Sequence, residues 1–153
     1  MMPEWMKKKK QLLDIEEAKI EAKRQRDLAI TSLIRLKRDA FWQRLKEQLS
    51  LTVEFLPQLN IAGTITPSGN GMRIQISRSG AFANQTHTDV MLTSDAIACN
   101  TLDGGSYKLL FCVIGDSEIG VAYESVDGPH LRPDGAAEHI MHQMVDLIES
   151  RHR

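Results

Sequence analysis

Three polar residues near the C-terminus have types that metal ions bind. His139, His142 and Asp146 belong to a segment whose apolar residues repeat with helical spacing, so all three are predicted on its polar side. Imidazole and carboxylate groups are common zinc ligands. Helical histidine pairs that hold zinc are normally four residues apart and take a third ligand from elsewhere, whereas these are three apart. A solvated helix face explains the same pattern, so we assign no metal and keep these three residues as the metal candidates.

A second candidate lies in the middle of the chain. His87 and Asp89 are two residues apart beside a predicted strand, so their side chains share one face. A histidine beside a carboxylate is a possible general base, although no nucleophile lies nearby in the sequence. A loop histidine with a turn-forming aspartate is the competing interpretation. Cys99 and Cys112 are surrounded by apolar residues, which predicts buried, unreactive thiols.

The glycine-rich turns match no phosphate-binding loop and no nucleophile elbow. We therefore expect no catalytic residue, no cofactor-binding residue and no cofactor. The enzymatic alternative is a small metal-dependent hydrolase that uses His87, Asp89 and residues of the last helix.

The basic residues of the first 50 positions are the most informative feature. At ~100° per residue, five of them fall within ~20° of one another on an ideal helix. They are Lys8, Lys19, Arg26, Lys37 and Arg44. Such a row suits contact with a partner or with nucleic-acid phosphates, but charged helix faces are also ordinary solvated surface.

The charge is divided between two parts of the chain. Residues 1–50 hold 13 Lys and Arg against 8 Asp and Glu, a net charge of +5, whereas residues 51–153 hold 6 against 12, a net charge of −6. The split predicts a non-enzymatic protein-interaction or assembly module in which the basic helix of one subunit contacts the acidic part of another. The alternative is a nucleic-acid-binding protein that uses the basic helix.

These residues need elements that position them. No proline or glycine occurs between Glu4 and Pro57, and helix-forming residues dominate, so residues 1–50 are predicted to form one long helix that ends between 50 and 56. Residues 1–27 form a projecting basic arm, and residues 28–50 have the apolar surface to pack on a core. A break near 24–28 and a strand over 51–56 stay open as alternatives.

Residues 51–153 contain short β-branched runs separated by turn residues, and then a helical pattern from Ala137 to Ile148. We expect an α+β fold: the long helix, an antiparallel meander of four to six strands and a C-terminal helix packed on the sheet. Residues 107–114 are predicted as a central strand, residues 90–100 as one kinked strand and residues 78–86 as a polar loop. A turn at Asp116 and Ser117 would place Ile114 opposite Ile119, and a turn centred between Gly105 and Ser106 would place Cys99 opposite Cys112; these registers predict one continuous apolar face. Its members are Ile97, Cys99, Leu110, Cys112, Ile114, Ile119, Val121 and Tyr123.

The predicted helix is too long for one small domain. Fifty residues span ~75 Å at ~1.5 Å per residue, whereas a domain of ~100 residues has a radius of gyration of only ~13 Å. An unpacked helix is marginally stable in water, so we expect a homo-oligomer, most simply a dimer. The longest apolar run has six residues, and no secretory signal pattern is present, so we expect a cytoplasmic protein with no membrane contact.

Overall fold

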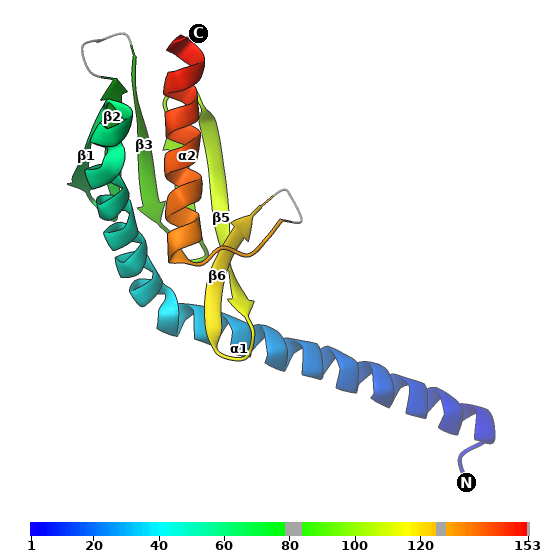
Figure 1. Cartoon of the computed structure of the whole chain (residues 1–153). Helices are drawn as coiled ribbons and strands as arrows, with labels where there is room; N and C mark the ends of the chain where they lie inside the picture. The colour runs from blue at the N-terminus through cyan, green and yellow to red at the C-terminus, as the bar shows by residue number, and fades with distance from the viewer. Residues whose placement is uncertain (79–83, 125–127, 153) are drawn as a thin grey trace.

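The computed structural model describes residues 1–78, 84–124 and 128–152. It confirms the α+β class, with a long helix, a six-stranded antiparallel sheet and a C-terminal helix (Figure 1). The elements are α1 (Glu4–Phe55), a 3₁₀ turn (Leu56–Leu59), β1 (Ile61–Ser68), β2 (Gly71–Arg78), β3 (Gln85–Leu92), β4 (Ala96–Thr101), β5 (Gly105–Ile114), β6 (Glu118–Tyr123) and α2 (Pro133–His152).

Helix α1 is continuous over 52 residues, as the absence of proline and glycine predicts, and has no break at 24–28. It ends at Phe55, inside the predicted interval, so residues 51–55 are helical and not a strand. Figure 1 shows α1 curving toward the sheet where its colour passes from blue to cyan. Packing on the core begins at Leu33 rather than at Leu28, which is 52% exposed.

The second half of α1 and helix α2 lie side by side on one face of the sheet (Figure 1). Helix α1 contacts β1, β5 and β6, whereas α2 lies over β2 and β3 and reaches β5 and β6 through the side chain of His139. The core is built from the apolar stripes of both helices and alternate residues of the strands. Phe41 of α1 meets Phe111 of β5 edge to face, with ring centroids 5.6 Å apart.

The strands follow one another across the sheet in chain order, from β1 to β6. β5 lies between β4 and β6, which confirms the predicted internal strand. The predicted single strand 90–100 is wrong, because the chain turns at residues 93–95 and forms β3 and β4. The predicted loop 78–86 is shorter at both ends, since β2 reaches Arg78 and β3 begins at Gln85; its residues 79–83 lie outside the described chain.

Both predicted hairpin registers are wrong. The β5–β6 loop contains residues 115–117, with Gly115 at a φ of 66°, so Ile114 lies opposite Glu118 instead of Ile119. The β4–β5 loop contains residues 102–104, and Cys99 lies opposite Tyr107 instead of Cys112. Because each shift is odd, it turns the other face of β5 to the core. Leu109 and Phe111 are therefore buried under the helices, while Leu110 and Cys112 are on the opposite face.

Candidate interaction surface

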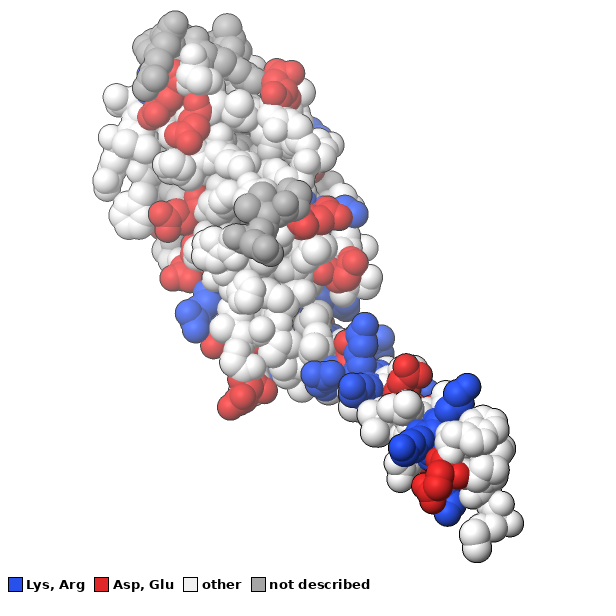
Figure 2. Space-filling model, turned by 90° about the vertical axis from the view of Figure 1, so that its right-hand side faces the viewer, with Lys and Arg blue, Asp and Glu red and all other residues white. Residues whose placement is uncertain are grey.

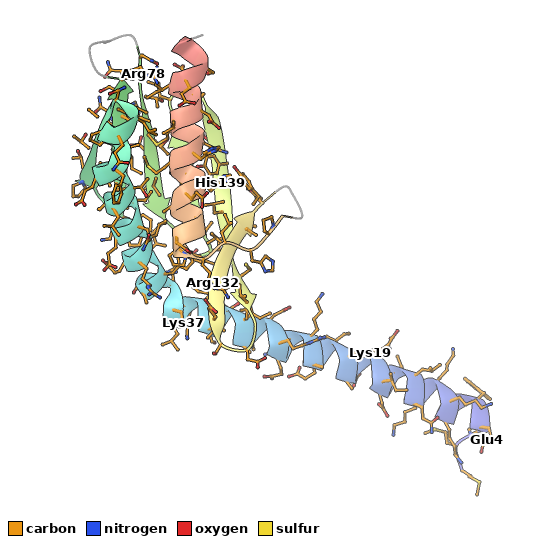
Figure 3. The ribbon with its side chains drawn as sticks, viewed as in Figure 1. Glu4, Lys19, Lys37, Arg78, Arg132 and His139 are labelled. Atoms are coloured by element: carbon orange, nitrogen blue, oxygen red, sulfur yellow. The ribbon has the colours of Figure 1, made fainter. Side chains whose placement is uncertain are left out.

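The first part of α1 is an arm that leaves the body of the molecule. Every residue from Met1 to Ser32 is exposed, and Figure 1 shows this stretch running out beyond the sheet. From here on, residues 4–32 are called the arm. The arm is helical throughout, so its side chains surround a straight segment on all sides (Figure 3).

The arm gives the molecule an unusually large surface. The accessible area is 10427 Å² for a chain of 17.2 kDa. A compact monomer of this mass exposes about 7,800 Å². The difference shows that the chain is far less compact than a typical monomeric domain.

Large apolar side chains lie on this exposed surface. Leu13 is 58% exposed and Ile20 69% exposed, and Met6 precedes them at the same spacing of seven residues. Leu13 is about ten helical turns before Leu49, at ~3.6 residues per turn, and the two side chains would lie on the same side of a straight helix. Leu49 is fully buried in the core. The stripe that packs on the sheet in the second half of α1 therefore reappears along the exposed arm, after an interruption at Asp27.

The predicted row of cations is divided between two environments. Lys8, Lys19 and Arg26 are exposed on the arm. Figure 2 shows blue Lys and Arg side chains along the arm, with red acidic side chains among them. Lys37 is half-buried, and Arg44 is exposed where α1 passes the β5–β6 hairpin. Both lie near Glu118, so the structure does not present the five as one free surface.

Glu118 has a closer partner that the sequence analysis missed. Arg132 Nε donates to Glu118 Oε1 at 2.9 Å, and Arg132 Nη2 approaches the other oxygen at 3.5 Å. Arg132 lies just before α2, and Figure 3 shows it and Lys37 near the β5–β6 hairpin. The bond from Arg132 lowers the pKa of Glu118, and the charges of Lys37 and Arg44 lower it further. The pair connects β6 to the residue just before α2 at an exposed position.

The structure does not bring the metal candidates together. His139 turns inward and its Nε2 bonds to the Tyr123 hydroxyl, so the prediction that it shares a solvated face with the other two is wrong. Gln143 donates to the same hydroxyl at 2.6 Å. His142 Nδ1 instead lies 3.3 Å from Asp146. The described residues contain no group of three side chains arranged to hold a metal ion.

His139 is nevertheless in an altered environment. Burial lowers its pKa below the usual 6.5, and the charge of His142 acts in the same direction. The rings of Tyr107 and Tyr123 both meet the imidazole edge to face. These contacts hold α2 against the sheet, which is a structural role. The sequence alone does not indicate this cluster, since Tyr123 and His139 come together only through the packing of α2.

His87 and Asp89 do share a face of β3, as the strand alternation predicts. Asp89, however, accepts two hydrogen bonds from Arg73 of β2, at 2.8 and 3.1 Å. These bonds lower the pKa of Asp89. The carboxylate is thus held by a guanidinium and is not positioned as the partner of a histidine base. Arg73 was missed because the β2–β3 register depends on a loop whose length the sequence does not reveal.

The two cysteines do not meet. Cys99 is buried, and the loss of hydration raises its pKa to about 12. Cys112 is half-buried on the other face of the sheet, opposite Gly120, and burial raises its pKa as well. The predicted burial is confirmed for Cys99, whereas Cys112 is only half-buried.

A groove of about 690 Å³ separates α1 from the β1–β2 hairpin and the β3–β4 turn. Trp42 lines it together with Arg38 and Lys46. Arg38 Nη1 donates to the Ser94 carbonyl at 3.0 Å and so attaches α1 to the β3–β4 turn. Among the described residues that line it, the groove gathers no carboxylate, histidine or cysteine.

Comparison with protein-family models, with curated proteins and with solved structures found no match for this chain. No helix in the described part of the chain has the length and apolar character needed to cross a bilayer.

Proposed function

We propose that this chain is a non-enzymatic assembly module whose helical arm binds a protein surface, most simply that of a second copy. The observation that supports this function is the exposed apolar stripe on a continuous helix. Helices in proteins gain most of their stability from tertiary packing of an apolar face, and the arm has no such packing in the single chain. Contact with a partner would bury the stripe and stabilise the arm.

The polar groups of the domain favour this interpretation over an enzyme. Asp89, Glu118 and His139 each have a partner within the fold, and these partners explain their positions. Two of the partners are guanidinium groups that hold a carboxylate in its charged form. The proposed function therefore rests on the arm and not on a cleft.

Light scattering coupled to size-exclusion chromatography tests the proposal. Full-length protein at micromolar concentration is expected to elute as an oligomer, with a mass of at least twice 17.2 kDa. A chain that begins at residue 28 is expected to elute as a monomer. The deletion removes no buried residue, so its circular dichroism should show a folded domain. A monomeric full-length protein that also captures no protein partner would overturn the proposal.

Nucleic-acid binding is the alternative function, and it can be tested with the same protein. Exposed Lys8, Lys19 and Arg26 would contact phosphates, and neutralising all three to Gln would abolish a gel shift with duplex DNA or RNA at low salt. The assembly module predicts a negligible shift with the wild-type protein and no change of oligomeric state in the triple variant. A gel shift that the triple variant loses would favour the nucleic-acid function instead.

A further inference from the structure

The charges of the arm are arranged antisymmetrically about Ile20. Between residues 14 and 26, every acidic residue has a basic residue at the same distance on the other side of Ile20. The uncharged positions also correspond, with Ala18 matched by Ala22. The charged matches are Asp14 with Arg26, Glu16 with Arg24, Glu17 with Lys23, and Glu21 with Lys19.

We propose that two copies of this chain pair their arms antiparallel, with the two-fold axis of the dimer passing beside Ile20. This inference rests on the proposed assembly function and names the partner, the orientation and the register. An antiparallel pair with this axis places each residue level with its match in the second copy. Acidic residues then lie level with basic ones along the central part of the contact.

The helix geometry decides which of these charges meet. We call the line along which the two arms touch the seam, and Ile20 points directly at it. Glu16 and Lys23 then lie ~40° and ~60° to one side of the seam, at ~100° per residue. The two-fold axis puts Lys23 of one copy beside Glu16 of the other, about one residue apart in height. The opposite side of the seam pairs Glu17 with Arg24 in the same way. Each pair occurs twice, which gives the dimer two symmetrical sets of flanking ion pairs.

These side chains are available in the single chain. Glu16, Glu17 and Lys23 are exposed, and within the described chain none of them forms an ion pair. Arg24 has only a long contact with Glu21, at 3.9 Å, and its side chain is 71% exposed. Interhelical pairing therefore breaks no strong interaction.

The same register covers the apolar stripe. Ile20 packs against Ile20 of the second copy, and Leu13 lies level with Asp27 of the second copy, whose neighbour Leu28 is ~80° from the direction of Ile20 at ~100° per residue. Met6 reaches the height of Ile34, close to Leu33, where α1 begins to pack on its own domain. The contact thus spans the exposed arm, and its first residues, from Glu4 to Met6, reach the height of residues 34–36, where the body of the second copy has begun.

Other arrangements of two copies place like charges together. A parallel pair in register would put the acidic segment 14–21 beside itself. An arm lying on the acidic domain of another subunit would bring this segment, with a net charge of −3, against a surface of the same sign. The overall +5 of the first 50 residues hides this local acidity.

Charge exchange is the test of the register. Reversing Glu16 and Glu17 to Lys replaces four flanking attractions by repulsions and is expected to weaken dimerisation by about tenfold or more. Reversing Lys23 and Arg24 to Glu should do the same. The fourfold variant E16K/E17K/K23E/R24E restores opposite charges at every flanking contact, so its dimerisation constant is expected to return to within about threefold of wild type. Analytical ultracentrifugation measures all four constants.

A matched control separates the seam from general charge effects. Asp14 and Glu21 lie ~100–120° away from the seam direction at ~100° per residue. The variant D14K/E21K changes net charge by the same amount as E16K/E17K and is expected to keep near-wild-type dimerisation. If the two variants weaken the dimer equally, or if the fourfold variant is not restored, the antiparallel register is wrong.

A cysteine at the axis gives an independent measurement. Ile20→Cys places two thiols across the two-fold axis and is expected to form a disulfide-linked dimer under mild oxidation. Ala22→Cys, on the far side of the helix, and wild-type protein with its own Cys99 and Cys112 serve as controls. If wild type dimerises but Ile20→Cys cross-links no faster than Ala22→Cys, the register is overturned while the assembly function stands. A monomeric wild-type protein overturns both.

Discussion

The two halves of α1 have the same backbone and different surroundings. Residues 33–55 bury Phe41, Trp42, Leu45 and Leu49 under α2 and against the sheet, whereas every residue of the arm is exposed. Both halves consist of strong helix formers, and the apolar stripe runs through both. Propensity therefore accounts for the helix, but it does not account for its stability. In the second half tertiary packing supplies that stability, and in the arm we propose that a partner supplies it.

The largest effect is expected when two apolar side chains of the same stripe, one in each half of α1, are shortened to alanine. Leu45 is fully buried, so Leu45→Ala is expected to lower the free energy of unfolding by about 2–5 kcal/mol, because it removes packing and leaves a cavity. Ile20→Ala on the arm should leave the unfolding of the dilute monomer unchanged and weaken only dimerisation. Urea denaturation followed by circular dichroism checks both.

Protein concentration is the control for that comparison. The Ile20→Ala variant should differ from wild type only at concentrations where wild type is dimeric. An unfolding midpoint that falls in the monomer as well would show that the arm packs on its own domain.

A smaller effect is expected at Asp27, which interrupts the stripe. In the proposed register Asp27 lies level with Leu13 of the second copy, so its carboxylate loses water without gaining a partner. Asp27→Leu is expected to tighten dimerisation on the order of tenfold, equivalent to about 1.4 kcal/mol. Sedimentation equilibrium of Asp27→Leu beside Asp14→Leu, which lies away from the seam, measures the difference. Equal effects at both positions would assign the gain to net charge alone.

The smallest expected effect is a pH dependence of stability that belongs to the domain and not to the arm. The pKa of His139 is lowered in the folded protein, mainly by burial, so the folded state favours the neutral ring. The unfolded chain binds this proton more readily, and stability present above pH 6.5 is lost as the pH falls below it. The arm contains no histidine. Unfolding midpoints should therefore fall as the pH is lowered from about 7 to about 5.

His139→Gln is the control for the pH effect. This variant should show a flatter midpoint over the same interval, and the dimerisation constant should stay constant there in both proteins. An equally steep pH dependence in His139→Gln would assign the titration to another group.

Local sequence predicted the elements of this fold better than their pairing. Residues 4–55 contain no helix breaker, so the long helix follows directly from the sequence. The β5 segment has apolar residues on both of its faces, which predicts a strand inside the sheet. Register depends on loop geometry instead. Gly115 takes a left-handed conformation that adds one residue to the expected β5–β6 turn, and the β4–β5 turn differs from the expected one as well, so Leu109 instead of Leu110 is buried.

The candidate surface shows the same limit. The exposure of the arm followed from its length, because no small domain can cover such a helix. The division of the cation row did not, since Lys37 and Arg44 meet Glu118 only through the packing of the β5–β6 hairpin against α1. The pattern of residue types could not predict contacts between residues that are distant in the sequence.

The continuity of α1 also sets a distance. Because α1 is continuous and curves only where it meets the sheet, the direction in which the arm is held also sets the direction of the sheet at the other end of the helix. In the proposed pair, Arg38, which attaches α1 to the β3–β4 turn, is 18 residues from Ile20. The Arg38 residues of the two copies, one on each side of the axis, would therefore be held about 54 Å apart at ~1.5 Å per residue. The arm would then act as a spacer whose length depends on its number of residues. The two sheets of the dimer would be held at a fixed separation.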